Sequence, residues 1–226
     1  MITVKNIKMA YNDDVVIDGL DISVASGEIV ALTGPSGCGK STLLRGLAGY
    51  QSITTDEFAI DGTQIAPNSQ QHREAIFSVF NEFSWIHGLT VLEHIELPFS
   101  GEHYSEQIRN TPDAPAVRGG AENALGKRTV LNPLEALELV GLADEAEKTP
   151  YELGIGQLQR AKLATIFVRD WQVLLLDTPD DHMSTESQEL VAGLIKKHVG
   201  KRCAIIVPKD ESFVTQLGGT VMELSQ

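Results

Sequence analysis

Few features of this chain point to secretion, metal binding or a membrane-spanning role. It has only two cysteines, Cys38 and Cys203, and their positions match no disulfide or metal-ligand pattern. No apolar run reaches the roughly 18 residues that a transmembrane helix needs. The opening segment Met1–Lys5 lacks the charged and apolar blocks of a signal peptide. We therefore expect a reducing, cytosolic setting and no membrane span within this chain.

Basic residues are also scarce. The chain carries 18 lysines and arginines against 31 aspartates and glutamates, which gives a formal net charge of −13. A nucleic-acid partner is therefore not expected, because phosphate backbones require a basic face. With 226 residues, the chain is long enough for one domain with a sizeable core and a subdomain. It contains no internal repeat and no low-complexity tract.

What the chain does contain is a complete phosphate-binding loop. The segment Gly34–Thr42 reads G-P-S-G-C-G-K-S-T and matches the pattern G-x-x-x-x-G-K-[ST] in full. The apolar run Ile29–Leu32 before it predicts a strand, and Leu43–Ala48 after it predicts the start of a helix. The positive end of that helix dipole would face a bound anion. The order of strand, loop and helix predicts nucleotide binding. The alternative is that the loop is retained without function.

Each part of the loop has an expected role. Its glycines allow consecutive backbone N–H groups to point inward and hold the β-phosphate. Lys40 can bridge the β- and γ-phosphates, and the Ser41 hydroxyl can hold Mg²⁺. We interpret Cys38 as a small filling residue, with alkylation of its thiol as an alternative. The predicted nucleotide-binding residues of the loop are Gly34, Pro35, Ser36, Gly37, Cys38, Gly39, Lys40, Ser41 and Thr42.

Strands and helices are expected to alternate along the chain. The clearest turns are Asp18–Gly19 and Ser26–Gly27, and Gly141 lies close to a predicted helix end. The segment 82–165 looks largely helical, and a further helix is expected around 186–198. Strands are expected at 2–4, 15–17, 22–24, 58–60, 76–80, 171–176, 203–207 and 220–224. Such alternation predicts an α/β fold with a mostly parallel core sheet.

One segment, from residue 100 to 129, departs from this alternation. It holds several prolines and glycines among polar residues and has no apolar period. A surface loop with partial disorder explains this composition, and an insertion that docks a partner is the alternative.

The phosphate loop and three later motifs together resemble the ATP-binding subunit of an ABC transporter, over essentially the whole chain. Leu89–Ile95 resembles the start of the family's helical subdomain. Glu152–Arg160 falls where the family has its L-S-G-G-Q signature, and Val173–Asp177 matches the second nucleotide motif. The resemblance implies a P-loop NTPase core with an antiparallel N-terminal β-subdomain and an inserted helical subdomain. The core would comprise 1–81 and 166–226, and the helical subdomain about 82–165, all within one domain.

The resemblance also implies ligands for ATP and Mg²⁺. Tyr11 would stack on adenine, with a packing role as the alternative. Asp177 would bind Mg²⁺ together with Ser41, and Asn81 is a further candidate ligand. The signature residues, which the family uses to contact the nucleotide of a second subunit, would be Leu153, Gly154, Ile155, Gly156 and Gln157.

Several catalytic positions of the family are replaced in this chain. Thr178 stands where a glutamate normally polarises the attacking water, and a hydroxyl cannot accept a proton as a carboxylate does. Lys209 replaces the switch histidine and offers a flexible positive charge within reach of the γ-phosphate. Asn81 replaces a glutamine and is one methylene shorter. Asp180 or Asp181 could substitute for the missing glutamate, although both follow a rigid proline.

The signature and the loop after the second motif are altered too. Gly154 removes the signature serine hydroxyl, and Ile155 places a β-branched side chain where the backbone must approach a phosphate closely. Ser184 replaces the aspartate that usually closes the loop. Because the phosphate loop is intact, we predict that ATP binding persists and that hydrolysis is weak or lost; compensating replacements with slow turnover are the alternative.

The resemblance implies a head-to-tail pair of ATP-binding subunits, either a homodimer or a heterodimer, coupled to a membrane-spanning permease. The chain would then be cytoplasmic and peripheral to the inner (plasma) membrane. Two other functions remain open: a soluble ATP-responsive scaffold or regulator, and an active transport ATPase with atypical catalytic residues.

Overall fold

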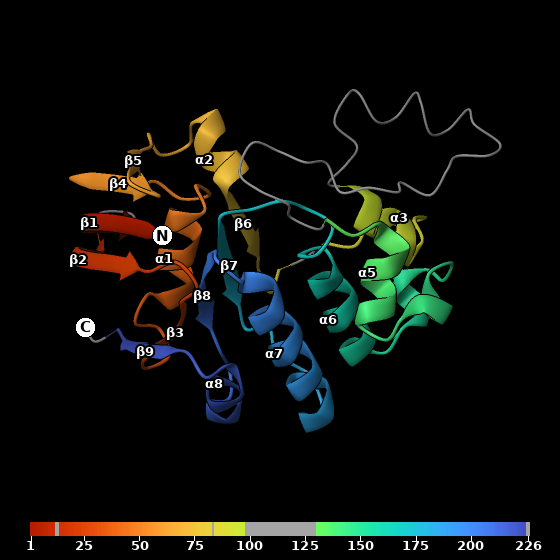
Figure 1. Cartoon of the computed structure of the whole chain (residues 1–226). Coiled ribbons are helices and arrows are strands. Elements are labelled where there is room, and N and C mark those ends of the chain that lie inside the picture. The colour runs from red at the N-terminus through yellow and green to blue at the C-terminus, as the bar shows by residue number, and fades with distance from the viewer. Residues whose placement is uncertain (12–13, 83, 98–129, 225–226) are drawn as a thin grey trace. The chain divides into compact units, whose positions relative to one another are not determined.

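The computed structural model describes residues 1–11, 14–82, 84–97 and 130–224, which belong to two compact units (Figure 1). Unit 1 is formed by Met1–Asn81 and Trp171–Gln226, and unit 2 by Glu82–Asp170. The irregular segment 100–129 lies outside the described residues, so both interpretations of it stay predictions.

Unit 1 contains an antiparallel sheet at its N-terminal end (Figure 1). Its strands, in spatial order, are β2 (Asp14–Val24), β1 (Ile2–Tyr11), β4 (Glu57–Ile60) and β5 (Thr63–Gln64). The predicted turn at Asp18–Gly19 is wrong, because both residues lie within β2. Ile7 pairs with Leu20 while Lys8 pairs with Asp18, so Gly19, at a φ of +81°, is the extra residue of a β-bulge.

The second sheet of unit 1 is entirely parallel and has the spatial order β6-β7-β8-β3-β9. Its strands are β3 (Ile29–Thr33), β6 (Ile76–Val79), β7 (Val173–Asp177), β8 (Cys203–Val207) and β9 (Thr220–Glu223). This confirms the predicted α/β class and the parallel core. Because β3, β7 and β8 are neighbours, the loops that leave their carboxyl ends lie at one edge of the sheet.

Both faces of the parallel sheet are buried along its central strands β7, β8 and β3. Alternate residues of β7 and β8, such as Val173 and Ile205, share one apolar cluster with Leu43 and Leu44 of α1 (Lys40–Leu47) and with strand residues of the antiparallel sheet. The intervening side chains point to the other face, and Leu174 and Ile206 are fully buried there. Helix α1 therefore packs between the two sheets.

Further helices of unit 1 follow the phosphate-loop helix. These are α2 (Gln70–Ala75), α7 (Thr185–Val199) and α8 (Glu211–Leu217), of which α7 and α8 contact each other (Figure 1). The sequence predicted α7 but neither α2 nor α8. Both are short, and helices of six or seven residues give too little apolar periodicity to be recognised.

Unit 2 is helical in its described residues. Helices α3 (Val91–Glu96), α5 (Pro133–Leu139) and α6 (Ile155–Ala164) contact one another, and the 3₁₀ turns Ala143–Glu145 and Pro150–Glu152 connect α5 to α6. Thr90 with Glu93, and Asn132 with Glu135, form capping boxes that set where α3 and α5 begin. In the part of the chain that the structure describes, no helix is long and apolar enough to cross a membrane.

Candidate nucleotide-binding site

The phosphate loop leaves β3 and enters α1, as the sequence predicted. Gly34, Gly37 and Gly39 have φ angles of +139°, +83° and +97°, which side-chain-bearing residues rarely adopt. A Cβ on Gly34 would lie 2.4 Å from the Leu224 carbonyl oxygen, and one on Gly39 would lie 2.9 Å from Val16. Gly37 has open space on the corresponding side. The loop is therefore packed at both ends and open in its middle.

The start of α1 is left open to a ligand. Among the described residues, no side chain caps this helix, and its first turn holds no acidic residue. Its first backbone N–H groups therefore lack intrahelical partners, and the positive end of the helix dipole is not compensated. Lys40 folds over the loop, where its Nζ donates to the carbonyl oxygens of Gly34 (2.8 Å) and Pro35 (2.7 Å). These donors fit a polyphosphate anion.

Two further residues of the predicted nucleotide site behave differently. Cys38 is 3% exposed, and this burial favours the filling role over alkylation; its Sγ lies 3.7 Å from Lys40 Nζ. Tyr11 is the last residue of β1, and its side chain lies outside what the structure describes. Its proposed contact with adenine therefore stays a prediction.

The second nucleotide motif ends at the same sheet edge. Asp177 closes β7 and is 6% exposed, and its Cα pairs with that of Val207 at the end of β8. Thr178 follows at a φ of +47°, an unusual conformation for a β-branched residue, and its N–H donates to the Val207 carbonyl oxygen at 2.7 Å. Asp177, with a carboxylate, and Ser41, with a hydroxyl, supply oxygen ligands of the kind that Mg²⁺ prefers.

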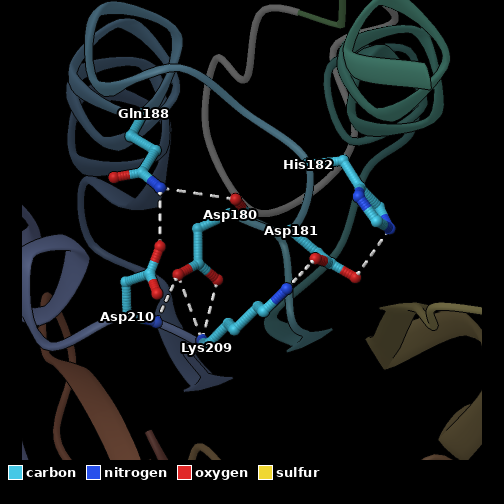
Figure 2. A network of polar contacts seen from close by, with 6 residues as sticks. All are labelled: Asp180, Asp181, His182, Gln188, Lys209 and Asp210. Carbon is cyan, nitrogen blue, oxygen red and sulfur yellow. Dashed lines mark hydrogen bonds and ion pairs between the residues drawn. The ribbon is translucent and has the colours of Figure 1, made fainter.

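Just after Thr178, two carboxylates bind the segment that follows β8 (Figure 2). Asp180 is 1% exposed and accepts backbone N–H bonds from Lys209 (2.9 and 3.1 Å) and Asp210 (2.7 Å). Asp181 accepts a bond from Lys209 Nζ at 2.5 Å, and its other oxygen lies 3.3 Å from His182 Nε2. Both carboxylates are therefore committed to structural contacts. This geometry gives no support to either as a substitute for the missing glutamate.

The charge states of these groups follow from their surroundings. Burial raises the pKa of Asp180 above its usual value, although hydrogen bonds from the backbone N–H groups of Lys209 and Asp210 oppose the shift. Partial burial also raises the pKa of Asp181. The hydrogen bond from Lys209 and the nearby positive charges outweigh this effect and bring the pKa of Asp181 below its usual value. The hydrogen bond to Asp181 raises the pKa of Lys209. Asp181 and Lys209 are thus both charged at neutral pH.

The sequence missed this arrangement. Asp181 and Lys209 are separated by 28 positions and stand in different loops, and no local motif joins them. The available signal was the strand order, because residues that follow two adjacent parallel strands leave the sheet at the same edge.

Two other replaced positions have different surroundings. Asn81 is exposed and lies just beyond β6. Ser184 is the N-cap of α7, and its Oγ accepts the Ser187 N–H at 3.3 Å. Aspartate, which the family usually has there, is an equally good N-cap residue, so Ser184 retains the capping part of that role.

The signature segment lies in unit 2, at the start of α6. Gly154 is the N-cap and provides no side-chain cap, while its own N–H donates to Gln157 Oε1 at 2.9 Å. Gln157 Nε2 also donates to Glu145 at 3.2 Å. Ile155, the first residue of the helix, is 60% exposed. The start of α6 thus presents an apolar side chain where the family has small residues.

A parallel sheet, a glycine-rich loop and an uncapped helix together define a P-loop nucleotide-binding protein. Comparison with known families then gives the particular class. A family model described as "ABC transporter" matches residues 17–181. The chain belongs to the ABC transporter family, which confirms the predicted family and its cofactors, ATP with Mg²⁺.

Curated relatives agree with this assignment. The chain is 31% identical to the sulfate/thiosulfate import ATP-binding protein CysA of Escherichia coli K12, over 100% of this chain and 58% of that protein. It is 29% identical to the spermidine/putrescine import ATP-binding protein PotA of Thermotoga maritima, over 87% of this chain and 48% of that protein. The chain thus spans about half the length of the curated relatives it matches.

Solved structures support the fold. The ATP-binding cassette MJ0796, in a dimeric post-hydrolysis state with ADP and Pi, gives a TM-score of 0.76 at 24% identity and covers 100% of this chain and 94% of that one. An ATP-bound bacterial Atm1-family exporter gives a TM-score of 0.74 at 22% identity, over 99% of this chain and 37% of that one. At these identities the likeness concerns the fold. The roles of individual site residues stay predictions.

Proposed function

We propose that this chain is the ATP-binding subunit of an ABC transporter, and that it binds MgATP at the phosphate loop while hydrolysing it slowly or not at all. The observation that carries the proposal is the contrast between two loops of unit 1. The helix that the phosphate loop enters begins without a side-chain cap, whereas the carboxylates next to Thr178 are bound to Lys209 and Asp210.

The proposed roles rest on the family's motifs, with support from the geometry of the phosphate loop and of β7. The backbone N–H groups of the loop and Lys40 bind the phosphates, and Ser41 and Asp177 hold Mg²⁺, which would neutralise phosphate charge. Tyr11 provides a surface for adenine. Thr178 can orient a water molecule, but it cannot accept a proton from that water. The loss of a general base lowers the rate by about 10²–10⁴-fold.

The proposed assembly places the chain at the cytoplasmic face of the plasma membrane, with a second ATP-binding subunit and a membrane-spanning permease. The names of the two curated relatives reported above, both import ATP-binding proteins, support a transport role. Bound ATP would stabilise the closed pair by binding it more tightly than the open state. Purification of the chain from solubilised membranes together with a membrane-spanning protein is the expected result. A strictly soluble monomer would favour a scaffold or regulator instead.

Binding and hydrolysis can be separated in one experiment. Excess purified chain is mixed with trace labelled MgATP, and retained label and released phosphate are followed together, with Lys40→Ala as the matched control. Retention without cleavage, absent in Lys40→Ala, is expected. Steady phosphate release that disappears in Lys40→Ala would show that the replaced residues still catalyse hydrolysis, and would overturn the hydrolysis-deficient part of the proposal.

A further inference from the structure

The contacts around Asp180 and Asp181 join parts of unit 1 that are far apart in sequence. They connect the loop after β7, the segment 208–210 after β8, and the start of α7 (Figure 2). On the α7 side, Gln188 is 5% exposed and its Nε2 donates to Asp210 Oδ2 at 3.0 Å. The same carboxylate makes no cap to α8, although Asp210 is the N-cap residue of that helix.

Segment 208–210 is held both through its main chain and through the side chain of Lys209. The Asp180 carboxylate binds its main chain through the N–H groups of Lys209 and Asp210, which fixes where the segment lies. The Asp181 carboxylate binds the Lys209 ammonium, which fixes where that side chain points. Consecutive acidic residues thus hold the backbone and the side chain of the same lysine.

We propose that Asp180 and Asp181 form a latch that keeps segment 208–210 in one position whether or not nucleotide is bound, and that holds the Lys209 ammonium away from the phosphates. The inference rests on the proposed function, since it concerns the same nucleotide site. Lys209 is then a positioning residue that joins two loops, and it is no ligand of the γ-phosphate. To reach another anion it must first give up a charge-assisted hydrogen bond, the stronger class of hydrogen bond.

The latch also gives the replacement at residue 209 a physical reason. A histidine ring is shorter than a lysine side chain and carries a full charge only when it is protonated. Lysine stays charged at neutral pH and reaches Asp181 through a flexible stem. The lysine at 209 and the aspartate at 181 are therefore complementary in charge and in reach.

Amide hydrogen exchange tests the latch directly. The amides of Lys209 and Asp210 are followed in the nucleotide-free protein for the wild type, Asp181→Asn, Lys209→Met and the double variant. Lys8→Met breaks the exposed Lys8–Asp18 pair (3.2 Å) of the antiparallel sheet and is the matched control. We expect about tenfold faster exchange in each single variant, no further gain in the double variant, and no change in the control.

Other results would overturn the latch. Exchange that stays within about threefold of the wild type in both single variants means that the ion pair does not hold the segment. The same conclusion follows if MgATP slows wild-type exchange at these amides by more than about threefold, because the segment would then respond to nucleotide. Asp181→Asn leaves the Asp180 carboxylate, and hence both backbone contacts, in place, so it is expected to fold.

A second readout separates positioning from phosphate binding. The ratio of MgATP to MgADP affinity is measured for the wild type and Lys209→Met. A ratio that changes by less than about threefold supports the latch, and a larger fall shows that the lysine already contacts the γ-phosphate. Hydrogen exchange in the nucleotide-free protein tests the latch without relying on nucleotide binding. If the wild type binds no MgATP, the proposed function fails, and the exchange result still decides whether the latch exists.

Discussion

Two sets of loops leave the carboxyl edge of the same parallel sheet, and they differ in how far their hydrogen-bonding groups already have partners within the chain. At the phosphate loop after β3, the N–H groups that begin α1 have no side-chain cap from the described residues, and Lys40 donates to neutral carbonyl oxygens of its own loop rather than to a carboxylate. The loops after β7 and β8 satisfy their donors internally, through Asp180, Asp181 and Ser184. An open set of donors binds an anion, while a closed set gives a fixed local structure.

This difference separates a region with groups free to bind a ligand from one whose hydrogen bonds are made within the chain. A buried polar group without a partner is costly. Asp180, at 1% exposure, accepts hydrogen bonds from the two facing backbone N–H groups of Lys209 and Asp210. The loop after Thr178 thus contributes to a stable arrangement of its own. Each prediction below tests one side of the comparison.

The largest effect is expected in the open region. Lys40→Ala removes an ammonium group that the loop holds over its own carbonyl oxygens, and we expect MgATP affinity to fall by about 10- to 100-fold, as for the loss of a hydrogen bond between charged groups. Thr178→Ala is the matched variant from the other region, with an expected change below about threefold. Calorimetric titration of both variants with MgATP measures this difference in affinity. Equal affinities would contradict the assignment of phosphate binding to the phosphate loop.

In the closed region, the largest effect is expected on stability. Asp180→Ala leaves the N–H groups of Lys209 and Asp210 without their acceptor, at an expected cost of about 2 kcal/mol in the free energy of unfolding. His182→Ala, in the same loop but with a half-exposed side chain, should cost less than about 0.5 kcal/mol. Urea denaturation compares the two. A cost at Asp180 no greater than that at His182 would mean that the closed network contributes little.

A smaller effect is expected at the start of α7. Ser184→Ala removes the side-chain cap to Ser187 and should lower the free energy of unfolding by about 1 kcal/mol. Ser184→Asp restores the residue type that the family usually has, and we expect it to match the wild type because aspartate caps equally well. Thermal and urea unfolding of the pair measure this. Strong destabilisation by Ser184→Asp would show that the serine has a further role.

The two regions also differ in how far the sequence predicted them. The place of the phosphate loop between a strand and a helix was predictable because its pattern is local: glycines, lysine and hydroxyls stand at fixed spacing. The strand Cys203–Val207 was predicted to the residue for a similar reason, since it is a continuous apolar run. Predicted turns were less secure, because Gly19 serves a bulge as readily as a turn.

The closed region was not predictable in the same way. Its contacts join residues that the chain brings together only when β7 and β8 pair, and the local contact of Asp181, with His182, does not point to Lys209. The sequence suggested a lysine free to reach the γ-phosphate. The structure instead binds that lysine to a carboxylate, a contact between side chains that no spacing rule within one loop could supply.

The smallest effect is expected from restoring the missing carboxylate. Thr178→Glu should fold, since an unbranched side chain tolerates the positive φ at this position at least as well as threonine. A general base contributes about 10²–10⁴-fold only when it is aimed at the water it activates. In this chain Lys209 stays bound to Asp181, and Asn81 and Gly154 still lack the groups that the family uses. We therefore expect phosphate release to rise by less than about threefold. A rise of 10²-fold or more, abolished by Lys40→Ala, would show that the closed loops never prevented catalysis and that one carboxylate was all that the site lacked.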